Sequence, residues 1–304
     1  MGSFRIPPLA LKLLGIFIFC VALGLGCTPS GDFDVVYHRA NGCRSDAPEN
    51  SLMGLQCVVE NCGSADSPCA LEGDVRIMRI VDGSAEGDLE LVWIHDGTTA
   101  RTARCPDGDL ELPGTSPIAL SQLQDCRLRR LDGTVTENEK IPTLDEVLEQ
   151  LQGTSVEFYL ELKGTGDAEL DEILARAAVL KVKAWNMVNQ TVVTSFQRDI
   201  LKTVEQTNPD VRRACFAPVG LTLEQSLSVF TGGILGDVDD CLRDGSHFVF
   251  VTPWALQGDV LQHIHSQNRK VGVFGADTLD GYEQVEAWQH KLHIVYADHP
   301  AMYE

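Results

Sequence analysis

Three carboxylates occupy positions from which they could share one cation. Glu72 and Asp74 in "EGDV" are two residues apart at the start of an apolar stretch, and Glu161 ends another such stretch in "YLELKG". Residues two apart on a strand point to the same face, so Glu72 and Asp74 should act together. Burying such charges without partners is costly, which predicts a bound cation or shared protons. Carboxylate oxygens favour a divalent ion of the hard class, Ca²⁺ or Mg²⁺, over zinc.

Two histidines and two cationic residues also lie at the ends of apolar runs. His38 and Arg39 follow the apolar run "FDVVY", His95 follows "LELVWI", and Lys163 lies two residues after Glu161. Two proton-transfer groups, two cations for an anion and one metal cage are a set suited to phosphodiester cleavage. Arg39 and Lys163 would hold phosphate oxygens while His38 and His95 exchange protons with the nucleophile and the leaving group.

The elements that must position these residues follow from hydrophobic periodicity. Eight short apolar runs alternate with longer segments whose apolar residues recur every three or four positions. The runs are "FDVVY", "ALEGDV", "VEFYLEL", "TVVTS", "VRRACF", "HFVFV", "KVGVF" and "HIVYA". Among the helical segments, 143–152 starts with a capping box formed by Thr143 and Glu146. This order predicts an α/β fold, a (β/α)₈ TIM barrel with its site at the carboxyl ends of the strands. A doubly wound sheet is the alternative, and no G-x-G-x-x-G follows the first strand.

A β-hairpin should extend the second strand. The segment between Arg76 and Leu91 is too short for a crossover helix, so "LELVWIHD" is expected to return antiparallel to "EGDVRIMRI". With the turn "VDGSAEGD" centred near Ala85, Asp74 would lie opposite Asp96 and His95 would approach the carboxylates. The long turn is expected to overhang the site.

Other polar and aromatic residues have supporting or alternative roles. Glu49 and Asn50 in "APEN" are expected to cap the next helix and brace the site, with a further ligand group as the alternative interpretation. Asp96 is expected to orient a neighbouring group. Phe196, Trp254 and Phe274 either line a substrate pocket or belong to the plain core. The remaining histidines have no partner pattern and are interpreted as solvated or helix-face residues: His247, His263, His265, His290, His293 and His299.

The N-terminus is typical of an export signal. Residues 1–26 contain Arg5 and Lys12, an apolar run and small residues, and the run is short for a membrane span of roughly 20 residues. Such a signal resembles that of a bacterial lipoprotein, with Cys27 lipidated as the first mature residue; plain secretion is the alternative. We expect a linker at 27–32, a single domain at 33–304, and a location at the cell envelope or periplasm.

Charge and cysteines agree with export. The formal charge of −20 becomes −22 once the two basic residues of the signal are removed, which argues against nucleic acid as a partner. Ten cysteines include Cys20 and Cys27, and the other eight are Cys43, Cys57, Cys62, Cys69, Cys105, Cys126, Cys215 and Cys241. Their spacing does not match a zinc knuckle, so disulfides are predicted, with Cys215 paired to Cys241 and Cys105 to Cys126.

These motifs together resemble the glycerophosphodiester phosphodiesterase family. The family pattern is visible in order as "HRANGCRSDAPENS", "EGDV", "WIHDGTTARTA", "IPTLDEVLEQL", "YLELKG", "TSFQ" and "ADHPAMY". The resemblance implies a (β/α)₈ barrel, His38 and His95 as the acid/base pair, and a metal held by Glu72, Asp74 and Glu161. It also implies phosphate binding by Arg39 and Lys163. Three features depart from the family: Ala40 replaces the usual glycine, the hairpin turn is longer, and Phe274 replaces a tryptophan.

The resemblance implies metal-dependent hydrolysis of glycerophosphodiesters to glycerol 3-phosphate and an alcohol. Two alternatives remain. One is a phospholipase D-type or lyase activity on lysophospholipids or sphingolipids that ends at a cyclic phosphate. The other is a barrel that only binds, without catalysis. The sequence does not indicate the head group, which histidine is the base, or the oligomeric state.

Overall fold

The computed structural model describes residues 33–62, 69–80, 88–113, 117–217 and 233–298. The expected signal, Cys27, the linker at 27–32, His299 and most of the turn "VDGSAEGD" lie outside these residues. Within the described ranges, no helix has the length and apolar character needed to cross a membrane.

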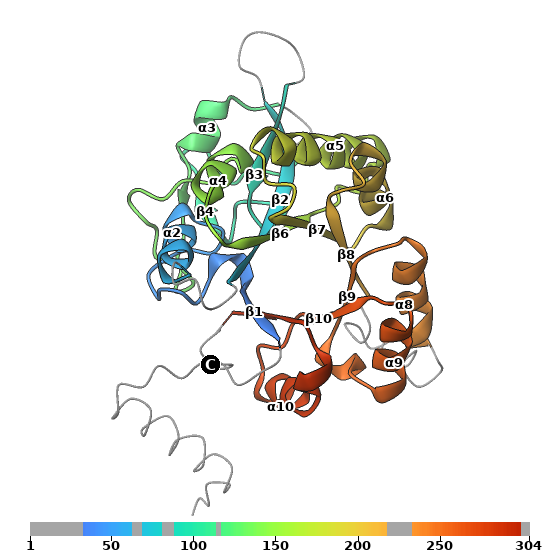
Figure 1. Ribbon diagram of the computed structural model, residues 1–304. Coiled ribbons are helices and arrows are strands. Elements are labelled where there is room, and N and C mark those ends of the chain that lie inside the picture. Colours follow the sequence, from blue (N-terminus) through green and yellow to red (C-terminus); the bar gives the residue numbers. More distant parts are fainter. Residues whose placement is uncertain (1–32, 63–68, 81–87, 114–116, 218–232, 299–304) are drawn as a thin grey trace, which may run out of the picture.

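Eight parallel strands close into a barrel, which confirms the predicted fold (Figure 1). The strands are β1 (Asp34–Tyr37), β2 (Ala70–Ile80), β6 (Glu157–Leu162), β7 (Thr191–Ser195), β8 (Arg212–Phe216), β9 (Phe248–Val251), β10 (Lys270–Val273) and β11 (Ile294–Ala297). Each corresponds to one of the eight apolar runs. Pairing of β1 with both β11 and β2 closes the ring and rules out an open doubly wound sheet.

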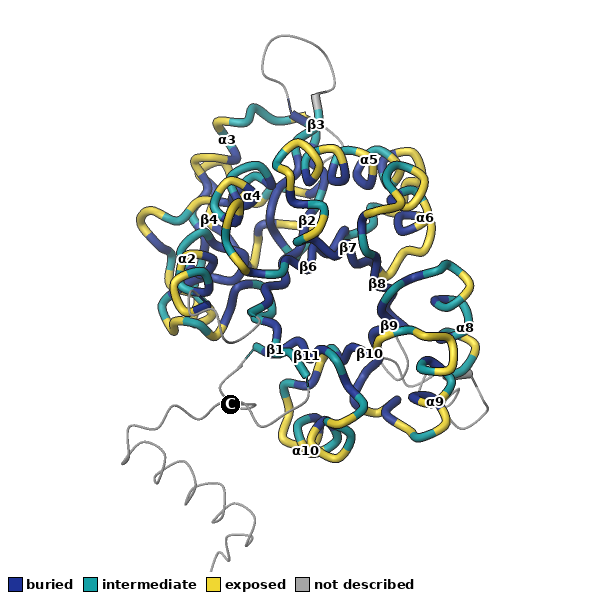
Figure 2. Tube along the Cα trace, viewed as in Figure 1, coloured by how far each residue is buried: buried dark blue, intermediate teal, exposed yellow. Residues whose placement is uncertain are grey.

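Helices surround the barrel, as Figure 1 shows. They are α2 (Leu52–Asn61), α4 (Leu144–Leu151), α5 (Ala168–Ala184), α6 (Arg198–Thr207), α8 (Gly233–Arg243), α9 (Gly258–Ser266) and α10 (Leu279–Trp288), with short 3₁₀ turns η1 (His38–Ala40), η2 (Pro253–Ala255) and η3 (Gln289–Lys291). The predicted capping box is present, because the Thr143 side chain accepts from Glu146 N and the Glu146 carboxylate accepts from Thr143 N. Buried positions line the barrel and the inner helix faces, whereas exposed ones lie outward (Figure 2).

A small lobe extends from one side of the barrel. Strand β3 (Asp88–Trp93) runs antiparallel to the outer half of β2, and β4 (Ala103–Arg104), α3 (Leu120–Gln124) and β5 (Arg127–Leu128) follow it. Met78 and Ile80 of β2 pack with Val92, Ile94 and other apolar residues of the lobe in a core of their own. The even-numbered residues of β2 therefore have two roles: Glu72 and Asp74 carry carboxylates in the barrel, whereas Met78 and Ile80 make apolar contacts in the lobe.

The hairpin is confirmed, but its expected register is wrong by two residues. Val75 pairs with Trp93, and Ile94 N donates to Asp74 O at 2.9 Å, so Ile94 rather than Asp96 lies opposite Asp74. The displacement keeps every side chain on its expected face because strands repeat every two residues. His95 and Asp96 consequently lie beyond the paired part of β3, in the loop that follows it.

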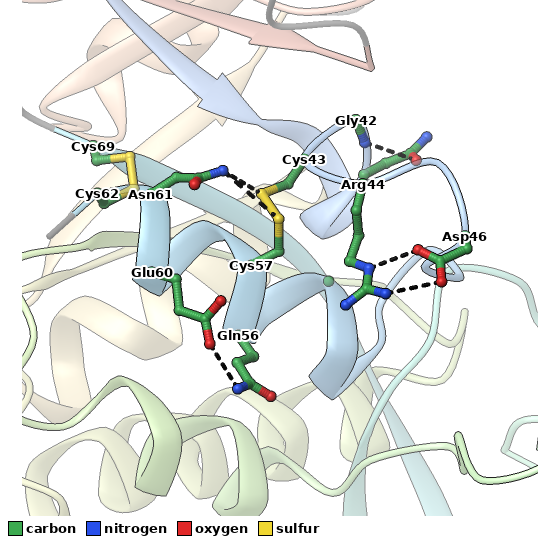
Figure 3. Close-up of a disulfide and its surroundings, with 12 residues drawn as sticks. Gly42, Cys43, Arg44, Asp46, Gln56, Cys57, Glu60, Asn61, Cys62 and Cys69 are labelled. Atoms are coloured by element: carbon green, nitrogen blue, oxygen red, sulfur yellow. Dashed lines mark hydrogen bonds and ion pairs between the residues drawn. A yellow bond between two sulfur atoms is a disulfide. The ribbon is translucent and has the colours of Figure 1, made fainter.

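All eight cysteines other than Cys20 and Cys27 are paired in disulfides. Cys105–Cys126 and Cys215–Cys241 confirm the two predicted disulfides, and Cys43–Cys57 and Cys62–Cys69 complete the set. Figure 3 shows the last two beside α2: one joins the middle of the helix to the loop after β1, and the other joins its end to the start of β2. The loop after β1 and strand β2, which both contribute residues to the barrel mouth, are therefore each cross-linked to this helix.

Gly73, between the two carboxylates of β2, allows Trp93 to pack directly on the strand. A Cβ at this position would lie 1.9 Å from Trp93 Nε1, and Trp93 is fully buried. We expect Gly73→Ala to lower the free energy of unfolding by about 1–3 kcal/mol, because the indole must move. Gly236→Ala on α8, where a Cβ meets open space, should instead raise it by about 0.5–1 kcal/mol. Urea unfolding of both variants tests this, and equal effects would contradict the close packing.

Candidate active site

The three predicted carboxylates converge at the barrel mouth. Asp74 and Glu161 are direct partners in the register of the neighbouring strands β2 and β6, and Glu72 is two residues before Asp74 on the same face. Glu72 and Asp74 are fully buried and Glu161 is 4% exposed. Their nearest carboxylate oxygens lie within 4.8 Å of one another. Strand pairing alone is thus sufficient to assemble the cluster.

Two cations balance part of this charge. Lys163 Nζ lies 2.5 Å from Glu161 Oε1 and 2.9 Å from Asp74 Oδ1, while Arg39 Nε lies 3.4 Å from Asp74 Oδ2. Burial opposes ionisation of Asp74, but Lys163 and Arg39 outweigh it and hold its pKa below the usual value. Glu72 differs, because burial and then the charges of Asp74 and Glu161 raise its pKa to about 8. The cluster therefore remains short of positive charge around Glu72.

The cluster has the properties of a divalent metal site. Its donors are carboxylate oxygens, as Ca²⁺ and Mg²⁺ prefer. The buried Glu72 Oε1 has no hydrogen-bond partner among the described residues. Such an orphaned acceptor is costly unless a cation or water satisfies it. Glu72, Asp74 and Glu161 could therefore hold a metal ion.

The loop after β1 approaches this cluster in a strained conformation. Arg39 and Ala40 both have a φ of 55°, in the left-handed region that glycine adopts at little cost. In this conformation Arg39 N donates to Glu72 Oε2 at 2.9 Å. Helix α2 packs tightly against the loop, since a Cβ at Gly54 would lie 2.5 Å from Ala40 O. Ala40 thus retains the backbone shape that a glycine would provide.

Asn50 connects the same loop to the metal-binding candidates. Its Nδ2 donates to Asp74 Oδ2 at 2.9 Å, its Oδ1 accepts from Asp74 N at 3.2 Å, and its own N donates to Arg39 O at 2.7 Å. The expectation that Glu49 and Asn50 cap the next helix is wrong. Ser51 caps α2, because its Oγ accepts from Gly54 N at 3.0 Å. Asn50 is turned towards β2 instead.

Each candidate histidine is held by an aspartate through the same ring nitrogen. His38 Nδ1 lies 2.6 Å from Asp298 Oδ1, and His95 Nδ1 lies 2.7 Å from Asp96 Oδ1. A carboxylate on Nδ1 favours the tautomer that leaves Nε2 for chemistry. His38 Nε2 is 3.8 Å from Glu72 Oε2, so this histidine borders the acidic cluster.

The two histidines have opposite pKa shifts. Burial lowers the pKa of His38, but the hydrogen bond to Asp298 and the charge of Glu72 outweigh it and raise the value to about 9. Burial lowers the pKa of His95, and Lys163 and Arg39 add to this; together they outweigh the charge of Asp74 and the hydrogen bond to Asp96, which raise it. One imidazole therefore retains its proton at neutral pH and the other is neutral, which is a useful pair for proton transfer. A cation at Glu72 would reduce the effect of that carboxylate on His38.

Sequence reasoning missed Asp298 and Arg101. A signal for Asp298 existed, because Tyr37 pairs with Ala297 and the next residues of β1 and β11 are His38 and Asp298. Arg101 lies in a turn after β3, and no spacing rule predicts its contacts. Its guanidinium binds both Glu49 and Asp96.

Aromatic residues occupy the opposite half of the mouth. Phe196 stacks on Phe216 with centroids 4.3 Å apart, and Phe274 meets Phe196 edge-on at 5.6 Å. Phe196 is 37% exposed and Trp254, in η2, is 53% exposed. The structure thus brings Phe196 and Phe274 together at the ends of β7 and β10, and it leaves Phe196 accessible over the buried Phe216.

A family comparison identifies this arrangement. The model of the glycerophosphoryl diester phosphodiesterase family matches residues 38–301, which include both histidines, the three carboxylates and Asp298. The chain belongs to this family. It is therefore an enzyme of the phosphodiesterase class, as the sequence motifs predict.

Solved structures share the fold of this family member. A glycerophosphodiester phosphodiesterase from Parabacteroides distasonis is 19% identical with a TM-score of 0.64, and the match covers 90% of this chain and 95% of that one. The Agrobacterium tumefaciens enzyme is 20% identical with a TM-score of 0.61, covering 89% and 99%. An Oleispira antarctica phosphodiesterase in complex with the product sn-glycerol-3-phosphate is 20% identical with a TM-score of 0.61, covering 88% and 93%. No curated protein matches the sequence.

The acidic cluster predicts that Glu72→Gln weakens binding of a divalent ion. We expect isothermal titration with CaCl₂ or MgCl₂ to give one site in the wild-type protein, and at least about a tenfold loss of affinity in the variant, since one anionic ligand is removed. Glu60→Gln on the surface of α2 is the matched control and should bind as the wild type does. Equal affinities of the Glu72 and Glu60 variants would exclude this cluster as the metal site.

Proposed function

We propose that the enzyme hydrolyses glycerophosphodiesters to glycerol 3-phosphate and an alcohol. The observation that supports this best is the pair of His–Asp contacts beside a buried acidic cluster, whose Asp74 is ion-paired with Arg39 and Lys163. The glycerol 3-phosphate found in the Oleispira antarctica relative is consistent with the same product class. The substrate is a small-molecule phosphodiester, and the strongly acidic chain disfavours nucleic acid.

The proposed mechanism assigns a task to each residue. Arg39 and Lys163 bind the phosphate oxygens, and His38 and His95 transfer protons through Nε2, with Asp298 and Asp96 fixing their rings. A glycerol hydroxyl of the substrate attacks the phosphorus, the alcohol leaves with a proton, and water opens the resulting cyclic phosphate. Ca²⁺ or Mg²⁺ held by Glu72, Asp74 and Glu161 would neutralise charge that develops on the phosphoryl oxygens.

A second candidate activity acts on lysophospholipids or sphingolipids and ends at the cyclic phosphate. The exposed, stacked Phe196 favours it, because an aromatic surface at the mouth suits an apolar substituent. A barrel that only binds is disfavoured, since the whole set of costly buried charges is retained.

Activity measurements test the proposed hydrolysis. We expect purified residues 27–304 to convert at least one of a panel of glycerophosphodiesters, with products identified by phosphorus NMR. His38→Ala and His95→Ala should each lower kcat by about 10²–10⁴, because each removes a proton-transfer group. EDTA should abolish turnover, and added Ca²⁺ or Mg²⁺ should restore it.

His263→Ala is the control, since this imidazole contacts Asp239 on the outer helices. Wild-type rates in either the His38 or the His95 variant would overturn the mechanism. A cyclic phosphate as the final product from lysolipids would favour the second activity, and no turnover of any substrate in the presence of metal would favour a binding protein.

We also propose that residues 1–26 direct export and that Cys27 is lipidated, which would keep the enzyme at the cell envelope. The apolar segment with Arg5 and Lys12 before it supports this. Expressed in a bacterial host, the full chain should appear in the membrane fraction, and Cys27→Ser should move it to the soluble fraction, because one acyl anchor is lost. Cys20→Ser is the control. A soluble, processed wild-type protein would indicate plain secretion.

A further inference from the structure

We propose that Arg101 is a positioning residue that holds the two loops of the site together and fixes His95 through Asp96. The proposal rests on the proposed function, in which His95 transfers protons and Arg39 binds phosphate. Among the described contacts, Arg101 touches neither His95 nor Arg39. It acts through the carboxylates of Asp96 and Glu49, which contact them.

The guanidinium of Arg101 makes two pairs of hydrogen bonds. Nε and Nη2 donate to Asp96 Oδ2 and Oδ1 at 2.6 and 2.9 Å, while Nη1 and Nη2 donate to Glu49 Oε2 and Oε1 at 2.9 and 2.6 Å. Planar forks of this kind impose geometry as well as attraction, which a lysine could not reproduce. Arg101 therefore fixes the orientation of both carboxylate planes.

Both carboxylates in turn contact the candidate catalytic groups. Asp96 Oδ1 lies 2.7 Å from His95 Nδ1, and Glu49 Oε2 lies 3.6 Å from Arg39 Nη1. Arg101 is thus the middle of a continuous chain from a histidine on the loop after β3 to an arginine on the loop after β1. Loss of Arg101 would release the carboxylates of Asp96 and Glu49 at once. The Glu49 side chain is only 7% exposed, so water could not fully replace the hydrogen bonds that this carboxylate loses.

The backbone that presents Arg101 is anchored on both sides. Thr99 is fully buried, with its N donating to Leu110 O and its Oγ1 accepting from Leu110 N, and Ala103 N donates to Thr99 O. The Arg101 side chain itself is 50% exposed. A half-exposed arginine on a rigid turn can be removed without creating a core cavity, so a functional effect can be separated from unfolding.

Kinetics and a double-mutant cycle test this role. We expect Arg101→Ala to lower kcat by about 10–100-fold, the range found when a group that orients a metal ligand or a reacting group is removed. Asp96→Asn should lower it comparably, and the double variant should be no worse than the poorer single one, because both act through His95. About 50 mM guanidinium chloride should restore part of the activity of Arg101→Ala but none of that of His95→Ala.

Arg44→Ala is the matched control. Arg44 binds Asp46 through a similar fork, as Figure 3 shows, is 47% exposed, and belongs to the same loop as Glu49. Among the described residues, its hydrogen bonds and ion pair go to Asp46 and not to the site. It should retain kcat within about twofold. Additive effects of Arg101→Ala and Asp96→Asn, or equal rates of Arg101→Ala and Arg44→Ala, would overturn the proposal.

Imidazole ¹⁵N NMR provides a readout independent of turnover. In the wild-type protein, His95, assigned with His95→Gln, should show a protonated Nδ1. In Arg101→Ala, the ¹⁵N chemical shifts of His95 should indicate a mixture of the Nδ1-protonated and Nε2-protonated tautomers. If the wild-type enzyme cleaves no tested diester, the proposed function fails while this measurement still decides the role of Arg101. An unchanged His95 signal would overturn it.

Discussion

Burial of three carboxylates in one barrel mouth is the constraint on which the rest of the site depends. Glu72, Asp74 and Glu161 are almost without solvent contact, and adjacent strands leave them no means of separating. Their mutual repulsion requires compensating charge in fixed positions. Lys163 and Arg39 supply part of it, as does the proton that His38 retains. The buried Glu72 Oε1, which has no hydrogen-bond partner among the described residues, marks where more is needed. The loop conformation around Arg39, with its left-handed residues, follows from this requirement.

The mouth is divided by chemistry. Strands β1, β2, β6 and β11 contribute charged side chains, whereas β7, β8 and β10 end in aromatic ones. Tyr296 lies between the halves: its ring stacks with His38 at 6.2 Å and meets Phe216 at the same separation. A diester bound with its phosphate at the charged half would place one substituent over the aromatic half. Under the proposed function, substrate preference would then be set by residues that take no part in the proton transfers.

Much of the fold could be predicted because strands and helices have local signals. Each of the eight apolar runs became a barrel strand, and the Thr143–Glu146 capping box started a helix as expected. The carboxylate cluster was also within reach, since parallel strands bring their carboxyl ends together. The hairpin register was wrong because its turn, rather than the apolar pattern, determines which residues pair.

Contacts between loops were the part that local patterns could not provide. Arg101 meets Glu49 across 52 residues of sequence, and His38 meets Asp298 across 260. The second contact follows from barrel closure once the pairing of β1 with β11 is known, but the first depends on the three-dimensional course of two irregular segments. Side chains that orient the reacting groups are thus harder to predict than the reacting groups themselves.

The disulfide between Cys43 and Cys57 makes assembly of the site sensitive to where the chain folds. It cross-links the loop bearing His38, Arg39 and Asn50 to α2, while Cys62–Cys69 fixes the start of the strand that bears Glu72 and Asp74. Thiols remain reduced in the cytosol and oxidise outside it. A newly made chain held in a reducing compartment would contain every chemical group of the site but lack both cross-links that restrict the movement of its two principal segments. With export as proposed above, oxidation would serve as a maturation step, coupling full rigidity of the site to arrival in an oxidising compartment.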